Sequence, residues 1–509
     1  MGLRDYTVYD FISRNARLYP DRECLVFNDT RLTHRQFKEK CDRLASGLLQ
    51  AGIRQGDRLG IVAHNCDEYV ILYGAAARIG AIVLPVNWRF QPDEVAYVLN
   101  DGAPAMVFVG PDYRQKLLDI KPALDVEPEF YAIGGGEAAN EYHPFESLYS
   151  DELADLEVEI EADIGYVIIH TAAVEGRPRG ALLSQRNIFS INLQVMINES
   201  LNADSCHICI LPLFHVAGLC HLMANLHAGG KNVILERFDP ERTLRLIESE
   251  KGSNFYNFAP ILKRLVDTHE SMGGGVDLST IENVAGMDHS ENLKRFREIA
   301  PNARFAAGFG QTEAMAVTWC PRDERPGSAG KPTHVSRVAL FDDDDNPVPT
   351  GSEGEICVRG PTVFLGYWGR KADTAYTFRY NWHHTGDIGR FDEDGYLWYV
   401  KRKAEKELIK PGGENVYPAE VEKVIREHPA VAEASVIGVP DRQWGEAIKA
   451  ICVLKPGEET GAQTLIDFVA DKIARYKKPK FVTFVDALPK TDDGEIDRDQ
   501  VKKEHGGKF

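Results

Sequence analysis

The sequence predicts an α/β protein with a large N-terminal domain of parallel-rich βαβ subdomains plus a barrel-like β subdomain, and a small mobile α+β C-terminal domain. Three observations predict it. Strand-like and helix-like runs alternate early in the chain, two strand-like runs flank an acidic turn later, and a shorter unit follows a charged segment near residue 400. At 509 residues the chain exceeds what one hydrophobic core supports, so at least two domains are expected.

The alternation is clearest over the first hundred residues. Apolar runs at 58–63, 81–86 and 105–109 are typical of buried strands, and the runs at 68–78 and 92–99 are typical of helices. The second of these helices opens with proline and two acidic residues, which is typical of a first helical turn. Strands that alternate with helices form a parallel sheet covered on both faces.

Residues 338–359 have a different character. Two strand-like runs there flank an acidic turn at 342–346, which indicates an antiparallel or barrel-like subdomain. The charged segment 401–410 is the expected linker to the smaller unit.

The smaller unit contains a predicted helix at 419–427 and predicted strands near Ala434 and Lys449. We therefore expect an N-terminal domain over residues 1–400 and a C-terminal domain over residues 403–509, joined at 401–402.

Composition limits the classes of partner. The hydrophobic content of 43% and charged content of 27% are ordinary for a globular protein, and the net charge of −18 argues against nucleic acid or an anionic membrane. No apolar run approaches the roughly 18 residues of a membrane-spanning helix, and the first residues lack the apolar core of a signal peptide. Nine scattered cysteines, an odd number, predict reduced thiols and a cytoplasmic protein.

Cys206 and Cys209 form a Cys-x-x-Cys pattern with two histidines nearby. The surrounding run at 206–213 is apolar and strand-like. Residues three apart in a strand point to opposite faces, which is poor geometry for a metal. We therefore expect buried structural thiols.

The most informative motif is Gly-Phe-Gly-Gln-Thr-Glu at 308–313. It offers a flat aromatic face for a base, a hydroxyl for a phosphate and a carboxylate for Mg²⁺. A second segment, 170–180, reads His-Thr-Ala-Ala-Val-Glu-Gly-Arg-Pro-Arg-Gly and lies between a strand-like run at 166–169 and a helix-like run from Gln185. Small residues let backbone N–H groups approach phosphates, so this segment is a candidate phosphate cradle, although an ordinary loop also fits it.

Further motifs follow at 385–387 (Thr-Gly-Asp), 412–418 (Gly-Gly-Glu-Asn-Val-Tyr-Pro) and 489–496 (Pro-Lys-Thr-Asp-Asp-Gly-Glu-Ile). In this order and spacing, the chain resembles the adenylate-forming acyl-CoA synthetases, the superfamily that also includes peptide-synthetase adenylation domains and luciferases. The resemblance runs from about residue 32 to about residue 498. It implies ATP/AMP, Mg²⁺ and coenzyme A as cofactors and a carboxylic acid as the small-molecule substrate, with no nucleic acid and no membrane span. It also implies that the N-terminal domain (1–400) holds the acid and ATP sites, that 401–402 is a hinge, and that the C-terminal domain (403–509) acts as a lid. A homodimer is left open.

The resemblance also implies roles for individual residues. Phe309 stacks on adenine, Thr312 bonds a phosphate, Glu313 binds Mg²⁺, and Asp387 with Arg402 holds the ribose. The remaining nucleotide contacts implied are Thr171, Gly176, Arg179, Gly180, Met287, Asp288, Gly310 and Gln311.

For the acid, the resemblance implies that His215 guards the pocket. Phe214, Tyr256, Gly286 and Gly308 are the expected pocket residues, which favours a compact acid, either aromatic, alicyclic or of short to medium length. For coenzyme A, the resemblance implies Gly412, Gly413, Trp444 and Gly445.

Two departures from the family pattern stand out. In the cradle segment the usual hydroxyl-bearing run is absent at 172–175, and Arg179 replaces the usual lysine. In the last motif the usual catalytic lysine is Glu495, whose charge opposes the negative transition state. Three interpretations remain open: another cation, Lys490 or Lys502, substitutes; the enzyme leans toward the ATP-forming direction; or the protein is catalytically weak.

The predicted function is a carboxylate–CoA ligase that forms acyl-CoA through an acyl-adenylate. Two alternatives are kept. One is an adenylation enzyme that loads a carrier protein, and the other is a catalytically weak homologue that binds acyl-nucleotide or acyl-CoA.

Overall fold

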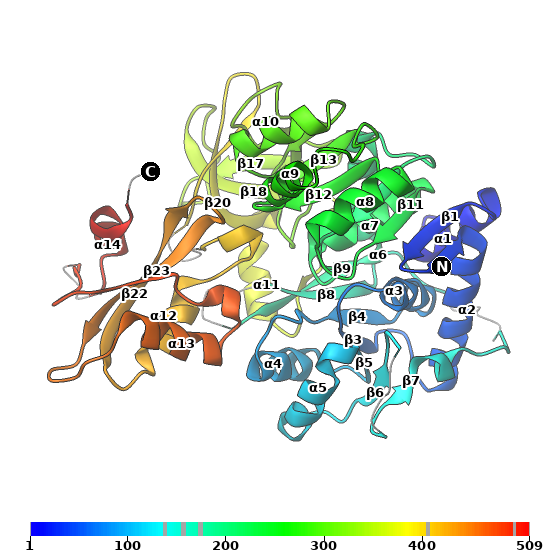
Figure 1. Cartoon of the computed structure of the whole chain (residues 1–509), viewed down its shortest axis with the longest axis horizontal. Helices are drawn as coiled ribbons and strands as arrows, with labels where there is room; N and C mark the ends of the chain where they lie inside the picture. Colours follow the sequence, from blue (N-terminus) through cyan, green and yellow to red (C-terminus); the bar gives the residue numbers. More distant parts are fainter. Residues whose placement is uncertain are drawn as a thin grey trace.

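The computed structural model describes residues 2–135, 140–153, 159–171, 177–403, 408–491 and 495–507. Figure 1 shows a large body that carries the N-terminus and a smaller domain, coloured orange to red, that carries the C-terminus. The described strands form four sheets, of nine, eight, four and three strands. This arrangement matches the predicted two-part α/β organisation.

The eight-stranded sheet has the order β19-β9-β8-β4-β3-β5-β6-β7. Its β3, β4, β5, β6 and β8 pair in parallel, as the early alternation predicts, and β9 is antiparallel to β8. The strands are β3 (Arg58–Val62), β4 (Ile82–Pro85), β5 (Met106–Val109), β6 (Glu129–Ala132), β7 (His143–Pro144), β8 (Gly165–Thr171), β9 (Arg179–Ser184) and β19 (Gly366–Tyr367).

The nine-stranded sheet has the order β16-β15-β14-β13-β12-β10-β11-β1-β2 and is parallel from β1 to β14. The strands are β1 (Glu23–Phe27), β2 (Thr30–Thr33), β10 (Cys206–Cys209), β11 (Lys231–Ile234), β12 (Asn254–Phe258), β13 (Asn283–Met287), β14 (Arg304–Ala307), β15 (Thr318–Pro321) and β16 (Lys331–Pro332).

Helices fill the space between these sheets and cover their outer faces. The central core unites the inner faces of both sheets with α1 (Val8–Leu18), α2 (His34–Gln50), α3 (Asp67–Ile79), α6 (Gln185–Glu199) and α7 (Val216–Ala228). The outer layers are α4 (Pro92–Gly102) and α5 (Arg114–Ile120) on one sheet, and α8 (Pro240–Glu250), α9 (Ile261–Ser271) and α10 (Ser290–Ile299) on the other.

Local sequence explains how these helices begin and how they are buried. Thr7 and Thr33 cap α1 and α2 with capping boxes, and α4 starts with proline at its first turn. Helix α3 is apolar on nearly all sides because it lies in the central core between the two sheets.

The four-stranded sheet is antiparallel, as predicted for residues 338–359. It consists of β17 (Arg337–Phe341), β18 (Glu353–Arg359), β20 (His383–Phe391) and β21 (Leu397–Arg402), and the short helix α11 (Lys371–Thr377) precedes β20. Strand β21 leads directly toward the C-terminal domain.

The C-terminal domain packs helices against a three-stranded sheet around its own core. Its elements are α12 (Pro418–Arg426), β22 (Val431–Asp441), β23 (Gly445–Leu454), α13 (Ala462–Lys472), β24 (Phe481–Phe484) and α14 (Arg498–His505). The predicted helix at 419–427 and both predicted strands are present.

A buried lysine joins the two domains. Lys477 Nζ lies 2.5 Å from Glu94 Oε1 in α4 and 2.6 Å from Glu420 Oε1 in α12, and only 2% of its side chain is exposed. Burial opposes the charge of Lys477, but Tyr476 and the two carboxylates outweigh burial and raise the pKa of this lysine. Gln91 adds a hydrogen bond from Nε2 to the Ala470 carbonyl, 3.1 Å long. These contacts hold the small domain against α4.

Two details of the fold bear on the sequence predictions. Cys206 and Cys209 are both buried in β10, and burial raises the pKa of each thiol to about 12, so the prediction of buried thiols is confirmed. The strand itself ends at Cys209 rather than at residue 213. Among the described helices, none is long and apolar enough to cross a membrane.

Candidate active site

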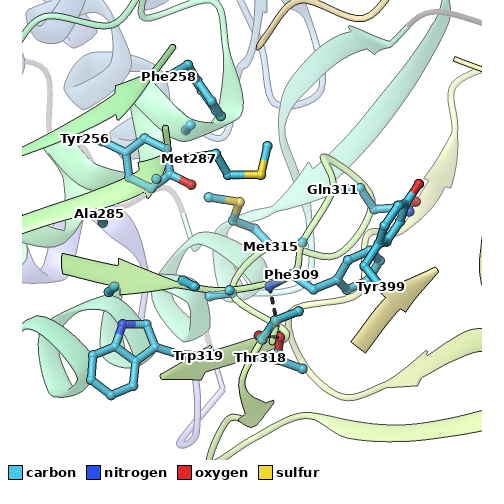
Figure 2. Close-up of a pocket in the computed structure, with 18 of the residues that line it drawn as sticks. Tyr256, Phe258, Ala285, Met287, Phe309, Gln311, Met315, Thr318, Trp319 and Tyr399 are labelled. Carbon is cyan, nitrogen blue, oxygen red and sulfur yellow. Dashed lines mark hydrogen bonds between the residues drawn. The ribbon is translucent and has the colours of Figure 1, made fainter. Parts of the chain in front are cut away.

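A cavity of about 1060 Å³ opens where the nine-stranded sheet, the four-stranded sheet and the C-terminal domain meet. Its walls come from β12, β13, β14, β20, β21 and the segment 308–318, together with residues of the small domain. Figure 2 shows Gln311 and Tyr399 on one side, Tyr256 and Phe258 on the other, and Met287 and Met315 between them. The cavity therefore has a polar side and an apolar side.

Asp387 anchors the polar side. It lies in β20 directly opposite Arg402 of β21. The Arg402 guanidinium donates from Nε to Oδ1 at 2.8 Å and from Nη2 to Oδ2 at 3.0 Å. Gln311 Nε2 donates to Oδ2 at 3.1 Å, and the Tyr399 hydroxyl donates to Oδ1 at 3.3 Å. The carboxylate is 1% exposed, and these four hydrogen bonds replace the water that it would bind at the surface.

The charges around this pair shift its neighbours. Burial opposes the charge of Arg402, but Asp387 and two tyrosines outweigh burial and raise the pKa of Arg402 above its ordinary value. Burial, followed by the charge of Asp387, raises the pKa of Tyr399 to about 12. Both groups therefore keep their protons at neutral pH.

Glu313 forms a second polar centre in the same cavity. Its Oε1 accepts from the Tyr367 hydroxyl at 2.9 Å and from Thr171 Oγ1 at 3.4 Å. The Arg179 guanidinium lies over the Tyr367 ring, 4.1 Å from the ring centroid. A cation therefore packs against the tyrosine that donates to the Glu313 carboxylate. Thr171 and Arg179 end β8 and begin β9, and both line the cavity.

Two glycines shape the strands around Phe309. A Cβ on Gly308 would lie 2.5 Å from the Thr318 carbonyl oxygen, and Phe309 N donates to Thr318 Oγ1 at 2.9 Å. Gly286 has a φ of +115°, and a Cβ there would lie 1.9 Å from the Asn257 carbonyl oxygen. Both positions are therefore restricted to glycine by the neighbouring backbone, as well as lining the cavity.

His215 caps the N-terminus of α7 and faces the apolar side. Its Nδ1 accepts from Ala217 N at 3.1 Å, so a neutral ring carries its proton on Nε2. Burial lowers the pKa of His215, which keeps the ring neutral at physiological pH. The ring meets Phe258 edge-on with 5.9 Å between centroids.

Phe214 does not line the cavity, so its prediction as a pocket wall is wrong. Its ring packs edge-on against Trp88, with 6.3 Å between centroids. Phe214 lies in a turn that His215 N closes by donating to the Pro212 carbonyl at 3.1 Å, immediately before α7 begins.

The cradle segment differs from its prediction in topology. It connects two antiparallel strands, β8 and β9, because 179–184 forms a strand before α6 begins. Gly180 lies within β9 opposite His170 and does not line the cavity. Gly176 lies outside the described residues.

Of the other predicted nucleotide contacts, Met287, Gly310, Gln311 and Thr312 line the cavity. Asp288 does not line it; its Oδ1 accepts from His289 N at 2.7 Å and from Asn292 Nδ2 at 2.6 Å, both at the start of α10.

The predicted coenzyme A residues form one contact of the small domain with the large one. Gly412 N donates to the Trp444 carbonyl at 3.0 Å, and its Cβ position lies 3.5 Å from the Ala259 carbonyl oxygen. A Cβ on Gly445 would lie 3.7 Å from His289 Nε2. The predicted coenzyme A residues Gly412, Trp444 and Gly445 do not line the cavity, although Lys410 and Glu446 of the same domain do.

Lys490 lies away from the cavity in this orientation of the small domain. Its Nζ pairs with Glu433 Oε1 at 2.7 Å on the exposed surface. Glu495 is also exposed, and its carbonyl accepts from Thr491 N at 2.8 Å. The structure therefore does not bring this motif to Asp387 or Glu313.

A different lysine enters the cavity instead. Lys410 of the small domain lines it near Arg402, and burial, then the charge of Arg402, lowers the pKa of Lys410. Its backbone N donates to Glu446 Oε2 at 2.6 Å. This residue ends the charged segment 401–410, which was expected to be a linker, and the available signal was a lysine directly after the apolar pair Leu408 and Ile409.

A buried acid–base pair on the apolar side of the cavity was also not predicted from the sequence. Glu199 at the end of α6 and His221 in α7 lie 3.2 Å apart, and both line the cavity beside Tyr256. His221 follows His215 by six residues, but no predicted site residue lies near Glu199 in the sequence.

Comparison with known proteins fits this geometry. A model of the AMP-binding enzyme family matches residues 12–368, and the AMP-binding enzyme C-terminal domain matches residues 420–495. The chain belongs to the AMP-binding enzyme family.

Three relatives illustrate the likeness. Feruloyl-CoA synthase of an Amycolatopsis species is 32% identical over 500 residues, covering 97% of this chain and 98% of that protein. A structure of o-succinylbenzoate CoA synthetase from Bacillus subtilis is 25% identical, with a TM-score of 0.85 over 99% of both chains. A structure from Rhodopseudomonas palustris, described as a long-chain-fatty-acid CoA ligase, is 44% identical with a TM-score of 0.74, covering 79% of this chain and 100% of that one.

These matches confirm the predicted family and the two-part α/β fold. The chain is an enzyme of the AMP-forming acid–CoA ligase family.

Proposed function

We propose that this AMP-binding enzyme activates a compact carboxylic acid with ATP and transfers the acyl group to coenzyme A. The supporting observation is that one cavity joins the Asp387–Arg402 pair, the Glu313 centre and an apolar pocket, and includes residues of both domains. Acyl-adenylate formation needs a nucleotide and an acid side by side, and thioester formation needs access for a thiol.

The polar side suits adenosine and phosphates. Asp387 keeps lone pairs beyond those used by Arg402, so it accepts from ribose hydroxyls. Phe309 offers a face for the adenine ring, with Met287 across the cavity. Thr312, beside Glu313, donates its hydroxyl to a phosphate oxygen.

Glu313 has the donor chemistry for Mg²⁺. One carboxylate oxygen is held by Tyr367 and Thr171, while the other accepts no hydrogen bond from a described residue. A buried carboxylate flanked by hydroxyls suits a hard cation. When bound, Mg²⁺ supplies positive charge to the triphosphate, and the protein holds the carboxylate in position.

Lys410 is our candidate for the cation that stabilises the negative charge between the acid and the α-phosphate. Among the described residues its ammonium forms no ion pair within 4 Å, and it lies in the cavity with Arg402. A preorganised cation at developing charge is the largest single contribution in many enzymes. His215, neutral and with its Nε2–H directed to the cavity side, excludes water and meets the acid carboxylate.

The apolar side suits a compact acid. Tyr256, Phe258, Met287 and Met315 form its walls (Figure 2). The names of two relatives, feruloyl-CoA synthase and o-succinylbenzoate CoA synthetase, point to aromatic acids, while the third points to long-chain fatty acids. Bulky aromatic walls favour the aromatic class.

One experiment tests this function. The protein is incubated with ATP, Mg²⁺ and a panel of aromatic, alicyclic and straight-chain acids, with and without coenzyme A, and the products are identified by mass. We expect AMP and pyrophosphate with every accepted acid, and acyl-CoA only with coenzyme A. Formation of ADP, or transfer to a carrier protein but not to coenzyme A, contradicts the proposal. Acyl-CoA, AMP and pyrophosphate supplied together test the ATP-forming direction.

A further inference from the structure

Three polar residues line the apolar side of the cavity: Glu199, His221 and Tyr256. We call this group the polar floor. Glu199 is the last residue of α6, His221 lies in the second turn of α7, and Tyr256 is central in β12. His221 Nε2 lies 3.2 Å from Glu199 Oε1, and the His221 and Tyr256 ring centroids are 4.2 Å apart. All three residues line the cavity.

The hydrogen-bond directions leave one acceptor open. His221 Nδ1 lies 2.9 Å from the Ala217 carbonyl, which can only accept, so Nδ1 carries a proton. The contact of Nε2 with Glu199 involves only Oε1. Glu199 Oε2 therefore remains available as an acceptor, and no described residue donates to it.

The Tyr256 hydroxyl is similarly open. It forms no hydrogen bond with any described residue, and Figure 2 shows it directed into the cavity toward Met287 and Met315. Burial, then the charge of Glu199, raises the pKa of Tyr256, so the group stays a phenol that can both donate and accept.

A purely structural role explains this floor poorly. A carboxylate at the C-terminus of α6 faces the negative end of the helix dipole, and it is also buried. An apolar substrate tail would cover Glu199 Oε2 and the Tyr256 hydroxyl without replacing their water. A donor on the substrate satisfies the acceptor directly.

We propose that the acid carries a hydrogen-bond donor, a hydroxyl or ring N–H, at the end remote from its carboxylate, and that Glu199 Oε2 accepts this hydrogen bond beside the Tyr256 hydroxyl. This inference rests on the proposed ligase function and narrows its substrate class. Glu199 and Tyr256 are then specificity-determining residues.

The test uses three matched pairs of acids, the para-hydroxy and para-methyl forms of benzoate, phenylacetate and cinnamate. The two groups have similar size, so kcat/KM within a pair isolates the hydrogen bond. For the pair of fitting length we expect about 10²-fold higher kcat/KM for the hydroxy acid, since a site built to bond a hydroxyl discriminates strongly against its absence. Equal values in all three pairs overturn the inference.

Variants assign the effect to the floor. Glu199→Gln keeps the size but replaces the charged acceptor by an amide, and we expect it to lower the hydroxy-to-methyl ratio at least about tenfold. Tyr256→Phe, which removes only the oxygen, should lower the ratio by a smaller factor. Glu241→Gln, the same change on the exposed face of α8, should leave the ratio unchanged. If both pocket variants keep the wild-type ratio, the inference is wrong.

Failure of the function is distinguishable. If no acid yields AMP and pyrophosphate, the ligase proposal fails, and calorimetric affinities of the same pairs still decide whether the floor selects a donor. A preference for octanoate, or for para-carboxy acids that Arg322 in the same cavity could pair, contradicts the proposed donor directly.

Discussion

Asp387 and Arg402 lie opposite each other on adjacent antiparallel strands, and their side chains meet through two hydrogen bonds of 2.8 and 3.0 Å. Arg402 stabilises the buried Asp387 carboxylate by these hydrogen bonds, and both side chains line the cavity. It also couples the nucleotide site to the chain that leads into the small domain, because Arg402 is the last residue of β21.

Replacing Asp387 by Asn should weaken nucleotide binding. The amide keeps the shape but loses the charge that ribose hydroxyls and Arg402 bond, and charge-assisted hydrogen bonds contribute roughly 1.5–3 kcal/mol. We expect the ATP dissociation constant to rise about 10- to 100-fold in calorimetry. Asp343→Asn, at a side chain that is 96% exposed, is the matched control. Unchanged affinity would make Asp387 a structural partner of Arg402 only.

Lys410→Met should slow acyl-adenylate formation. The variant keeps the side-chain length and removes the buried ammonium, and loss of one preorganised donor costs roughly 10²–10³ in rate. Pyrophosphate exchange measures this step alone. Lys423→Met, on the exposed face of α12, should behave like wild type. A full exchange rate in Lys410→Met would exclude this lysine from the first half-reaction.

Local sequence patterns predicted the order of elements and much of the cavity. Parallel strands and their helices follow from short apolar runs, and the segment 308–313 with Asp387 and Arg402 follows from motif spacing. Side-chain direction was less predictable: Phe214 turns away from the cavity, and Gly180 lies inside a strand. Lys410 and the Glu199–His221 pair escaped prediction because domain docking and the packing of α6 against α7 bring them to the cavity.

Glu94→Gln should loosen the small domain. Lys477 would lose one of its two carboxylates while still buried, and a buried charge with fewer partners is destabilising. We expect faster limited proteolysis between the two domains and unequal changes in the thioester step and in pyrophosphate exchange. The same substitution at exposed Glu427 is the control. Equal change in both half-reactions would count against a role for this contact in domain orientation.

The predicted hinge at 401–402 is tested by Lys401→Pro. Lys401 lies in β21 and pairs with Ile388 of β20. A proline at position 401 fixes φ and removes the backbone N–H donor. If the small domain rotates at this point between half-reactions, one half-reaction should fall much more than the other. Single-turnover assays of each step provide the comparison. Equal losses, with the fold intact by circular dichroism, would place the hinge elsewhere.

Glu495→Lys tests the departure in the last motif. In this orientation residue 495 is exposed and Lys490 pairs with Glu433, so the new ammonium reaches the cavity only if the small domain rotates. If rotation brings the motif to the α-phosphate, pyrophosphate exchange should accelerate by up to about 10²-fold, the contribution of one preorganised cation. The thioester step should change little, since we expect it to use an orientation of the small domain other than the one that would bring residue 495 to the α-phosphate. Combining Glu495→Lys with Lys410→Met separates the roles of the two lysines. Rescue of pyrophosphate exchange means that both stabilise the same negative charge, whereas additive effects mean that each acts at its own step.

If Glu495→Lys is no faster than wild type and Lys490→Ala is unaffected, the C-terminal motif supplies no catalytic cation in this enzyme.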